Sequence, residues 1–214
     1  MAPPDDPISP DFAVPDFVVI DVETACSRSS SICQIGIVAY HAGREVFAWE
    51  TLVDPCDEFS AFNTAIHGIA AHHCEGAPDF PTLHAVIDGH LTGRLTVAHS
   101  SFDRHALAKA CLLHDRPPIE TRWLDSVTVA RRAWPDLANH KLGTLARHLG
   151  LIHRHHDALS DARAAGMVIL HAIEHTGIDL AGWLAPPVRR RARKEKAAKQ
   201  PLKQARTEAV KHDA

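Results

Sequence analysis

The chain has 214 residues with a formal net charge of −3, and its composition (45% hydrophobic, 23% charged) is that of a globular protein large enough for one well-packed domain. It contains no run of about 18 apolar residues, and its acidic, proline-rich start lacks the basic and apolar regions of a secretory signal, so neither a membrane span nor such a signal is expected. Five cysteines without a C-x-x-C pair argue against a disulfide framework or a structural zinc site and favour a reducing cytoplasm.

The first part of the chain is predicted to form three strands after a disordered leader over residues 1–15. The strands are rich in β-branched residues and cover residues 17–23, 32–40 and 46–53. Because the links between them are short, we expect an antiparallel meander.

Helices and strands alternate in the second part. Residues 60–91, interrupted by Pro78 and Pro81, are expected to form short helices and loops. Longer elements follow, namely strands over residues 95–99 and 122–125 and helices over residues 103–114, 142–149 and 157–175. Ser100 or Ser101 can cap the first of these helices. Together the elements predict an α/β fold with a mixed five-stranded sheet flanked by helices.

The charge is distributed unevenly between this domain, over residues 16–184, and a basic tail over residues 185–214. From residue 186 to the end, ten Lys and Arg outnumber three Asp and Glu, so this segment carries a net charge of +7 and residues 1–185 carry −10. We expect the tail to be disordered, with an extended helix as the alternative. An acidic body with a basic tail suits an enzyme whose acids hold metals and whose substrate is a polyanion, although a tail that only aids solubility is also possible.

Three acidic residues are expected at one edge of the sheet. If the fourth strand lies beside the first and parallel to it, their carboxyl ends meet, and Asp21, Glu23 and Asp103 share the cleft in which open α/β sheets bind ligands. Asp21 and Glu23 lie on the same strand face. A D-x-E pair often marks a solvent-facing strand end, but the apolar residues before it indicate a central strand. Asp103 can equally serve the dipole of its helix.

A fourth carboxylate and a histidine lie near the start of the last long helix. Asp161 is at helical spacing from Ala158 and Ala165, so it is expected to face the packed side, where an unpaired carboxylate requires a cation or a proton. A salt bridge to Arg163 is a weak alternative, because side chains two residues apart on a helix do not face each other. His156 alone would be an ordinary loop residue. Four carboxylates and one imidazole are nevertheless sufficient to hold two divalent cations and activate a water.

Five segments resemble the three exonuclease motifs of the DEDD superfamily in its histidine-bearing DEDDh (DnaQ-like) branch, which includes the epsilon subunit of bacterial DNA polymerase III and ribonuclease T. They occur in the family order and cover residues 21–24 (Asp-Val-Glu-Thr), 32–36 (Ile-Cys-Gln-Ile-Gly), 66–69 (Ile-His-Gly-Ile), 98–103 (Ala-His-Ser-Ser-Phe-Asp) and 156–162 (His-x-Ala-x-x-Asp-Ala). The resemblance covers roughly residues 16–180. The sister branch has a tyrosine four residues before the final aspartate, where this chain has Asp157, so only the histidine branch is consistent.

The resemblance implies a ribonuclease-H-like fold and, for residues 16–184, a 3′–5′ exonuclease domain that releases nucleoside 5′-monophosphates from DNA. It implies that two Mg²⁺ or Mn²⁺ ions are held by Asp21, Glu23, Asp103 and Asp161, and that neutral His156 takes the proton of a metal-bound water. It also implies contacts with the terminal nucleotide from Thr24, His67, Gly68 and Ile69.

For several of these residues the sequence also allows a purely structural role. Gly68 is compatible with an ordinary turn, and Ile66 and Ile69 with core packing. Phe102 could stack on a base, although core packing is the simpler interpretation. Gln34 is expected to satisfy local backbone groups rather than to contact substrate.

Other functions and partners stay open at this point. The expected partner is nucleic acid with single-stranded or frayed 3′ ends, DNA being favoured, and a polymerase or another replication or repair protein is a further candidate partner. The alternatives are an RNA-trimming 3′–5′ exoribonuclease and a non-catalytic nucleic-acid-binding module of the same fold. A histidine-rich zinc protein is a third, since the chain has 17 histidines with clusters at His72-His73 and His153-x-His155-His156, neither of which has cysteine partners.

Overall fold

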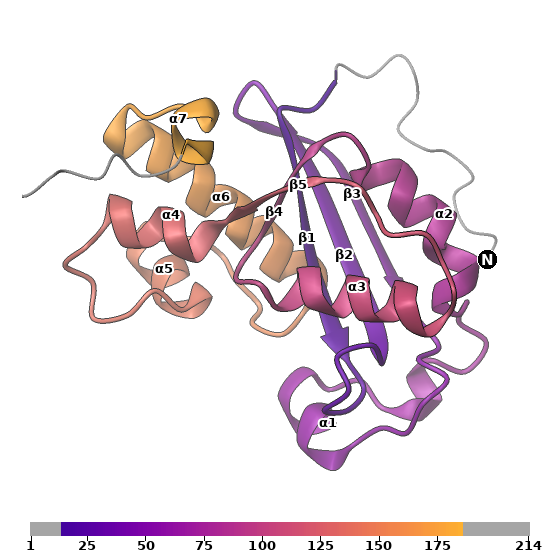
Figure 1. The fold of residues 1–214 in the computed structure, drawn as a ribbon. Coiled ribbons are helices and arrows are strands. Elements are labelled where there is room, and N and C mark those ends of the chain that lie inside the picture. The colour runs from indigo at the N-terminus through magenta and orange to yellow at the C-terminus, as the bar shows by residue number, and fades with distance from the viewer. Residues whose placement is uncertain (1–13, 186–214) are drawn as a thin grey trace, which may run out of the picture.

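A five-stranded mixed sheet forms the centre of the protein (Figure 1). The computed structural model describes residues 14–185, so the predicted leader and basic tail lie outside the described residues except for Val14, Pro15 and Ala185. The strand order is β3-β2-β1-β4-β5. The first three strands pair antiparallel, whereas β4 and β5 run parallel to β1. The strands are β1 (Phe17–Thr24), β2 (Ile32–His41), β3 (Arg44–Leu52), β4 (Leu95–Ala98) and β5 (Arg122–Asp125). The predicted mixed five-stranded sheet is confirmed.

Strand β1 lies in the middle of the sheet because it is apolar on both faces. Val18, Val19 and Ile20 are completely buried, and successive side chains enter opposite cores. Val19 packs in the core that contains Ile169, and Ile20 packs in the core that contains Ile87. Burial of each such side chain stabilises the fold by about 1.5–3 kcal/mol.

Helices cover both faces of the sheet (Figure 1). On one face lie α2 (Phe80–Leu91) and α3 (Phe102–Leu113), and on the other lie α4 (Ser126–Ala133), α5 (Leu142–Leu149), α6 (Ala158–Thr176) and α7 (Leu180–Leu184). Two short elements, α1 (Ala61–His67) and the 3₁₀ helix η1 (Ala71–His73), lie beyond the carboxyl end of β1. None of the helices within residues 14–185 has both the length and the apolar character needed to cross a membrane.

The helices differ from the sequence-based predictions in three places. Neither α4 nor α7 is predicted; each is short and begins after an aspartate whose carboxylate accepts backbone N–H groups, Asp125 for α4 and Asp179 for α7. The expectation that Pro81 interrupts helical structure is wrong, because this proline lies in the first turn of α2, where its missing N–H has no helical acceptor. Ser101 precedes α3 without a side-chain cap, while Ser100 Oγ accepts the N–H of Phe102 at 3.2 Å.

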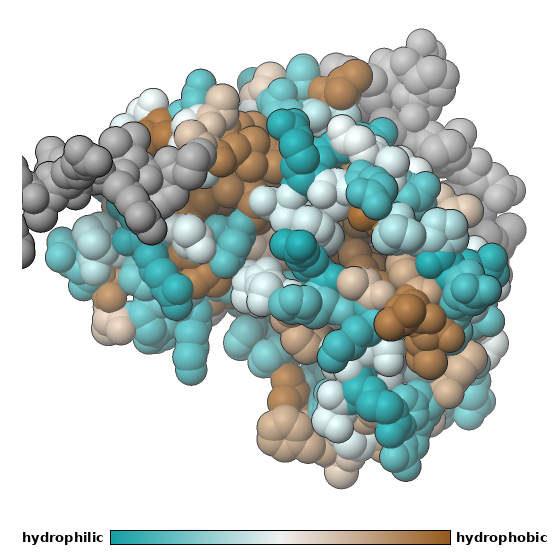
Figure 2. Space-filling view, viewed as in Figure 1, coloured by the Kyte–Doolittle hydropathy of each residue, from teal (hydrophilic) through white to brown (hydrophobic). Residues whose placement is uncertain are grey.

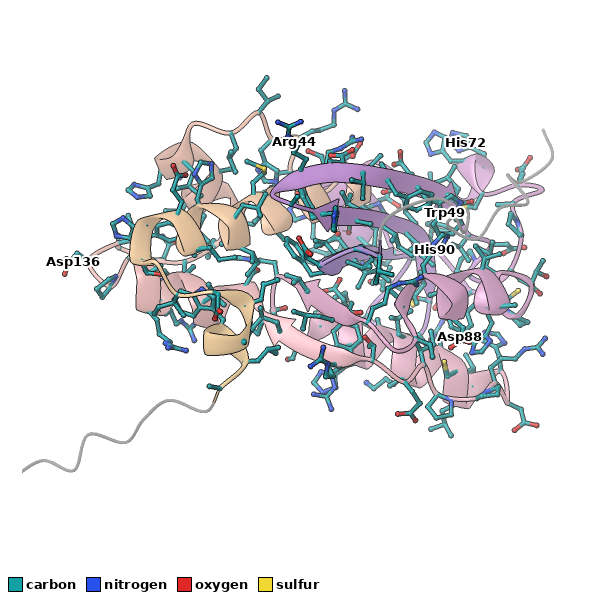
Figure 3. All side chains as sticks on the ribbon, turned by 90° about the horizontal axis from the view of Figure 1, so that it is seen from above. Arg44, Trp49, His72, Asp88, His90 and Asp136 are labelled. Carbon is teal, nitrogen blue, oxygen red and sulfur yellow. The ribbon has the colours of Figure 1, made fainter. Side chains whose placement is uncertain are left out.

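A buried histidine couples the stability of one core to pH. His90 on α2 is 1% exposed and packs against the rings of Phe47 and Trp49; Trp49 and His90 are labelled in Figure 3. Within residues 14–185 its Nδ1 atom has no hydrogen-bond partner. Burial, assisted by the nearby charge of Arg94, lowers the pKa of His90 to about 4. The imidazole is therefore neutral in the folded protein at neutral pH.

We expect wild-type protein to lose stability, relative to a His90→Leu variant, as the pH falls from 6.5 toward 4. In this range the unfolded chain binds a proton at His90 and the folded chain does not, so the difference in unfolding free energy should change by up to about 3 kcal/mol. Urea unfolding of both proteins between pH 7.5 and 4.5 measures this difference. A difference that stays constant over that range would contradict the assignment.

Candidate active site

The parallel pairing of β1 with β4 brings acidic side chains together beyond the carboxyl ends of these strands. Asp21 and Glu23 lie near the end of β1, and Asp103 lies in the first turn of α3, which follows β4. Asp103 is 3% exposed, and its Oδ1 accepts the N–H of Val22 at 3.0 Å. This bond ties the start of α3 to the end of β1, so the three carboxylates lie at one edge of the sheet.

Helix α6 brings the fourth carboxylate because its first turn rests directly on β2. The N–H of Ala158 donates to Gln34 Oε1 at 3.2 Å, so Gln34 satisfies a backbone group, although that group is 124 residues away rather than local. Asp157 Oδ1 caps the helix by accepting the N–H of Ser160 at 3.0 Å. Asp161, one turn into α6, is 4% exposed. The weak alternative of an Asp161–Arg163 pair is wrong, since Arg163 binds Glu45.

Gly36 on β2 permits this close approach. A Cβ atom at this position would lie 2.5 Å from the carbonyl carbon of Ala158 and 2.5 Å from the backbone nitrogen of Leu159, closer than packed atoms can come. Both contacts are with backbone, which cannot move as a flexible side chain does. The glycine therefore fixes the distance between β2 and the helix that carries Asp161.

We expect Gly36→Ala to lower the unfolding free energy by about 1–3 kcal/mol or more and to reduce activity, because α6 must move away from the sheet. Gly89→Ala is the matched control: Gly89 lies in α2 with open space around its Cβ position, so alanine there should be neutral or stabilising. Thermal unfolding of both variants measures the effect. Equal melting temperatures for the two would contradict the packing argument.

Crowding of the carboxylates gives them unusual acidities. Burial first, and then the charges of Asp161 and Asp103, raise the pKa of Glu23 to about 8. Burial, opposed by backbone hydrogen bonds, raises the pKa of Asp103 to about 7. Burial and then the charge of Asp103 raise the pKa of Asp21 well above its usual range. Four ionised carboxylates are stable together only with compensating positive charge, and clustered carboxylate oxygens are the ligands that hard divalent cations prefer. The residues present therefore fit such cations.

His156 lies at the side of this cluster, in the loop before α6. Its backbone has a φ of 64°, and its N–H donates to Asp161 Oδ2 at 3.0 Å. Its ring faces Glu23, with 3.8 Å between His156 Nδ1 and Glu23 Oε1. Burial first, and then the neighbouring imidazole of His155, lower the pKa of His156. The ring is thus held in the cleft in its neutral form near neutral pH.

Two further histidines of the same loop contact Asp161, and the sequence reasoning did not identify them as site residues. His153 has a side chain that is 6% exposed, and its Nε2 contacts Asp161 Oδ1. His155 Nδ1 lies 3.5 Å from Asp161 Oδ2. The only signal in the sequence is the cluster His153-x-His155-His156, which lacks the cysteine partners of familiar zinc motifs and supports only the alternative of a histidine-rich zinc protein.

One wall of the cleft is formed by the end of β1 and by α1. His67 is held by its two ring nitrogens: Nδ1 accepts the N–H of Ile69 at 3.0 Å, and Nε2 lies 3.1 Å from the carbonyl oxygen of Thr24. This pattern assigns the proton to Nε2. Gly68 ends α1 with a φ of 79°, so it has the role of a turn residue, and Ile69 is 8% exposed, so it has the role of a core residue. Ile66 is exposed, and core packing does not account for it.

Phe102 corrects the sequence-based interpretation. Core packing was the simpler expectation, but the side chain is 44% exposed and lines the cleft. Its position in the first turn of α3 leaves it outside the core between this helix and the sheet, which is filled from later turns of α3. Phe102 is therefore available for contact with a ligand.

The cleft has a volume of about 850 Å³, which is sufficient for a nucleotide. Phe62 and Ile66 of α1 line one wall, and Figure 2 shows a hydrophobic patch over α1 near the lower edge of the molecule. Arg131 of α4 and Lys141 at the start of α5 line the opposite wall. The acidic cluster thus lies between an apolar wall and a basic wall, an arrangement suited to a ligand with both bases and phosphates.

Comparison with known proteins agrees with this geometry. The exonuclease family model RNase_T matches residues 18–169. DNA polymerase III PolC-type of Streptococcus pyogenes serotype M5 (strain Manfredo) is 30% identical over 168 residues, which is 77% of this chain and 12% of that protein. The chain thus spans about one eighth of the length of the curated relatives it matches.

Two solved structures have the same fold. Exonuclease X in complex with 5′-overhanging duplex DNA superposes with a TM-score of 0.66 at 23% identity, over 78% of this chain and 97% of that chain. The nuclease domain of 3′hExo, a DEDDh family member bound to rAMP, superposes with a TM-score of 0.64 at 20% identity, over 75% of this chain and 92% of that chain. The predicted ribonuclease-H-like fold is confirmed.

Proposed function

This chain belongs to the RNase_T exonuclease family, and from that premise we propose that it is a member of the DEDDh branch of the DnaQ-like exonucleases and removes nucleotides from the 3′ end of single-stranded or frayed DNA in a reaction that requires divalent cations. The observation that carries the proposal is the convergence of Asp21, Glu23, Asp103 and Asp161 beside His156 in one cleft. We further propose that residues 16–184 are the exonuclease domain.

The four carboxylates would hold two Mg²⁺ or Mn²⁺ ions. When bound, such ions make a coordinated water nucleophilic and stabilise the negative charge on the leaving oxygen. Burial first, and then repulsion between the carboxylates, raise the pKa of Glu23 and of Asp103, and the positive charge of bound cations would favour the ionised form of both.

His156 would act as the general base. Nδ1 faces the carboxylate of Glu23, which favours the tautomer with the proton on Nδ1. The lone pair of the neutral ring is then at Nε2, where it can take the proton from the attacking water. The water oxygen bonds to the phosphorus of the terminal linkage, and the bond to the 3′ oxygen of the preceding nucleotide breaks. That oxygen leaves as the new 3′ hydroxyl after gaining a proton, and the terminal nucleotide departs as a nucleoside 5′-monophosphate.

The terminal nucleotide would be positioned by residues around the acidic cluster. Phe102 offers an exposed aromatic ring on which a base can stack. His67 and Asn63 hold the carbonyl oxygen of Thr24, with 2.8 Å between Asn63 Nδ2 and that oxygen. This keeps Thr24 in place beside Glu23. We propose that Thr24, Phe102 and the segment His67–Ile69 contact the sugar and base.

DNA is the favoured substrate and a polymerase the favoured partner because the curated relatives are DNA polymerases of the PolC type. In those proteins the matching segment is 12% of the length, so it belongs to the same polypeptide as the rest of the polymerase. The basic tail would add phosphate contacts that are independent of sequence. Deletion of residues 186–214 should then weaken DNA binding and reduce its dependence on salt concentration.

The proposal is tested with oligonucleotides labelled at the 5′ end and incubated with Mg²⁺ or Mn²⁺. A ladder of products shortened stepwise from the 3′ end is expected, fastest with single-stranded or mispaired DNA. Faster shortening of RNA would favour the exoribonuclease alternative, and zinc retained through purification with no nuclease activity would favour the zinc protein. Activity that persists in excess chelator would refute the metal requirement.

A further inference from the structure

The loop before α6 places three imidazoles beside the carboxylates of the cleft, and the proposed reaction uses only one of them. His156 faces Glu23, whereas His153 and His155 face Asp161. The His153 side chain is almost completely buried, and its Nε2 contacts Asp161 Oδ1. His155 is half exposed, with its Nδ1 at 3.5 Å from Asp161 Oδ2. His153 and His155 thus face the two oxygens of one aspartate, and the proposed hydrolysis requires neither of these imidazoles.

We propose that His153, His155 and Asp161 form a second cation site, selective for Zn²⁺ and similar transition metals, and that occupation of this site inhibits the enzyme. The three potential ligand atoms all lie within 4.8 Å of one another. In a tetrahedral zinc site with bonds of 2.0–2.1 Å, ligand atoms are about 3.3 Å apart. The distance of 3.5 Å from His155 Nδ1 to Asp161 Oδ2 is already close to that value, and His153 Nε2 contacts the other oxygen of the same carboxylate.

The chemistry of the donors distinguishes this site from the carboxylate cluster beside it. Two imidazole nitrogens and one carboxylate oxygen suit Zn²⁺, whereas Mg²⁺ binds imidazole poorly and prefers oxygen ligands. Asp21, Glu23 and Asp103 provide oxygen ligands only. The half-exposed His155 lines the cleft, so the fourth coordination position would face water.

The loop is held in the required conformation by the first turn of α6. The N–H of Arg154 donates to Ser160 Oγ at 2.8 Å, and the N–H of His156 donates to Asp161 Oδ2 at 3.0 Å. These bonds flank His155 on both sides. The ligands are therefore positioned before a cation arrives, and little ordering of the loop is required on binding.

Inhibition follows because Asp161 belongs to both sites. A Zn²⁺ ion held by the two histidines would use Asp161 oxygens that the proposed function assigns to Mg²⁺, and the imidazoles give Zn²⁺ the higher affinity. The inhibition rests on the proposed function, but the binding of zinc does not. The two can therefore be tested separately.

Binding is measured first, by calorimetric titration of the full chain with Zn²⁺ alone and by the visible spectrum of the Co²⁺ form. We expect one tight site with the absorption of tetrahedral Co²⁺, and an affinity at least tenfold lower in His155→Ala and in His153→Gln. Loss of an outer-shell partner alone typically costs 10–100-fold, so loss of a ligand should cost no less. Circular dichroism identifies any variant that fails to fold; His155 is exposed enough that its replacement should not unfold the chain.

Matched controls address two other potential zinc ligands of the described residues. His72, labelled on η1 in Figure 3, is an exposed histidine beside His73, and Cys56 is an exposed thiol. His72→Ala and Cys56→Ser should bind Zn²⁺ as wild type does. The group formed by Glu23, His156 and Asp161 also has ligand atoms close enough to hold a metal. Unchanged affinity in both His153→Gln and His155→Ala, or a loss confined to His156→Ala, would overturn the proposal.

Inhibition is measured by adding Zn²⁺ at a fixed Mg²⁺ concentration and comparing each protein with its own activity before the addition. Half-inhibition of His155→Ala should require at least tenfold more Zn²⁺ than half-inhibition of wild type. Equal concentrations would overturn inhibition through this site. A chain with no nuclease activity in Mg²⁺ would refute the proposed function, while the titration would still decide whether the zinc site exists.

Discussion

Asp21→Asn should abolish activity and, at the same time, stabilise the metal-free protein at high pH. Asparagine preserves the shape of the side chain but removes the charge that would bind the cations. Such ions contribute several kcal/mol of transition-state stabilisation, so kcat/KM should fall by about three orders of magnitude or more. The Mg²⁺ affinity measured by calorimetry should fall with it.

The opposite effect on stability follows from the raised pKa of Asp21, which is caused by burial and by the nearby charge of Asp103. A carboxyl group with a raised pKa stabilises the fold only while it is protonated, and its contribution is lost as the pH rises through the folded-state pKa. The contribution of an asparagine side chain to stability does not change with pH, because this side chain does not titrate. In excess chelator, therefore, the melting temperature of Asp21→Asn should exceed that of wild type increasingly as the pH rises.

Asp136→Asn is the control, because Asp136, labelled in Figure 3, is exposed and does not line the cleft. It should change neither activity nor melting temperature. If Asp21→Asn were as active as wild type, Asp21 would not be a metal ligand. If it were destabilised at every pH, its role would be structural.

His156→Ala should lower kcat by about 10²- to 10⁴-fold while leaving the Mg²⁺ affinity nearly unchanged. A positioned general base contributes rate acceleration of that size. His156 is not one of the four proposed metal ligands. Its backbone N–H, which donates to Asp161 Oδ2, remains in the alanine variant. Single-turnover kinetics and calorimetry measure the two quantities separately. His105→Ala, an exposed histidine on α3, is the matched control.

Rescue by added imidazole provides a second test of the base. The side chain of His156 is partly exposed in a cleft of about 850 Å³, so a free imidazole has room to enter. Partial recovery of kcat with imidazole, at unchanged Mg²⁺ affinity, is expected. Full activity in His156→Ala without imidazole would show that another group takes the proton.

The parts of the fold that the sequence predicts are those in which burial dictates the pattern of residues. The apolar run before Asp21 indicates a central strand, and β1 is central because both its faces are covered. The unpredicted helices α4 and α7 have eight and five residues, too few for a clear helical period. Their starts depend on one capping aspartate each, which a sequence pattern alone does not separate from an ordinary turn.

The candidate site likewise contains residues whose positions the sequence predicts and residues whose positions depend on tertiary contacts. Asp161 is predicted to face inward from its spacing along one helix, and it is buried. The orientation of Phe102 depends instead on how the first turn of α3 meets the end of β1, and that depends on contacts 81 residues apart in sequence. The contact of His153 with Asp161 likewise depends on the conformation of an irregular loop. Periodicity contains no information about either.

The bond that joins Asp103 to Val22 and the packing of α6 on β2 also set the time at which the site can form during synthesis. Asp21 is made early, but the cleft lacks Asp161 until α6 has left the ribosome and packed against Gly36. Domains fold as units once their chain is available. A nascent chain that still lies beside messenger and ribosomal RNA therefore has no complete acidic cluster, and the proposed hydrolytic activity can arise only when the domain is finished.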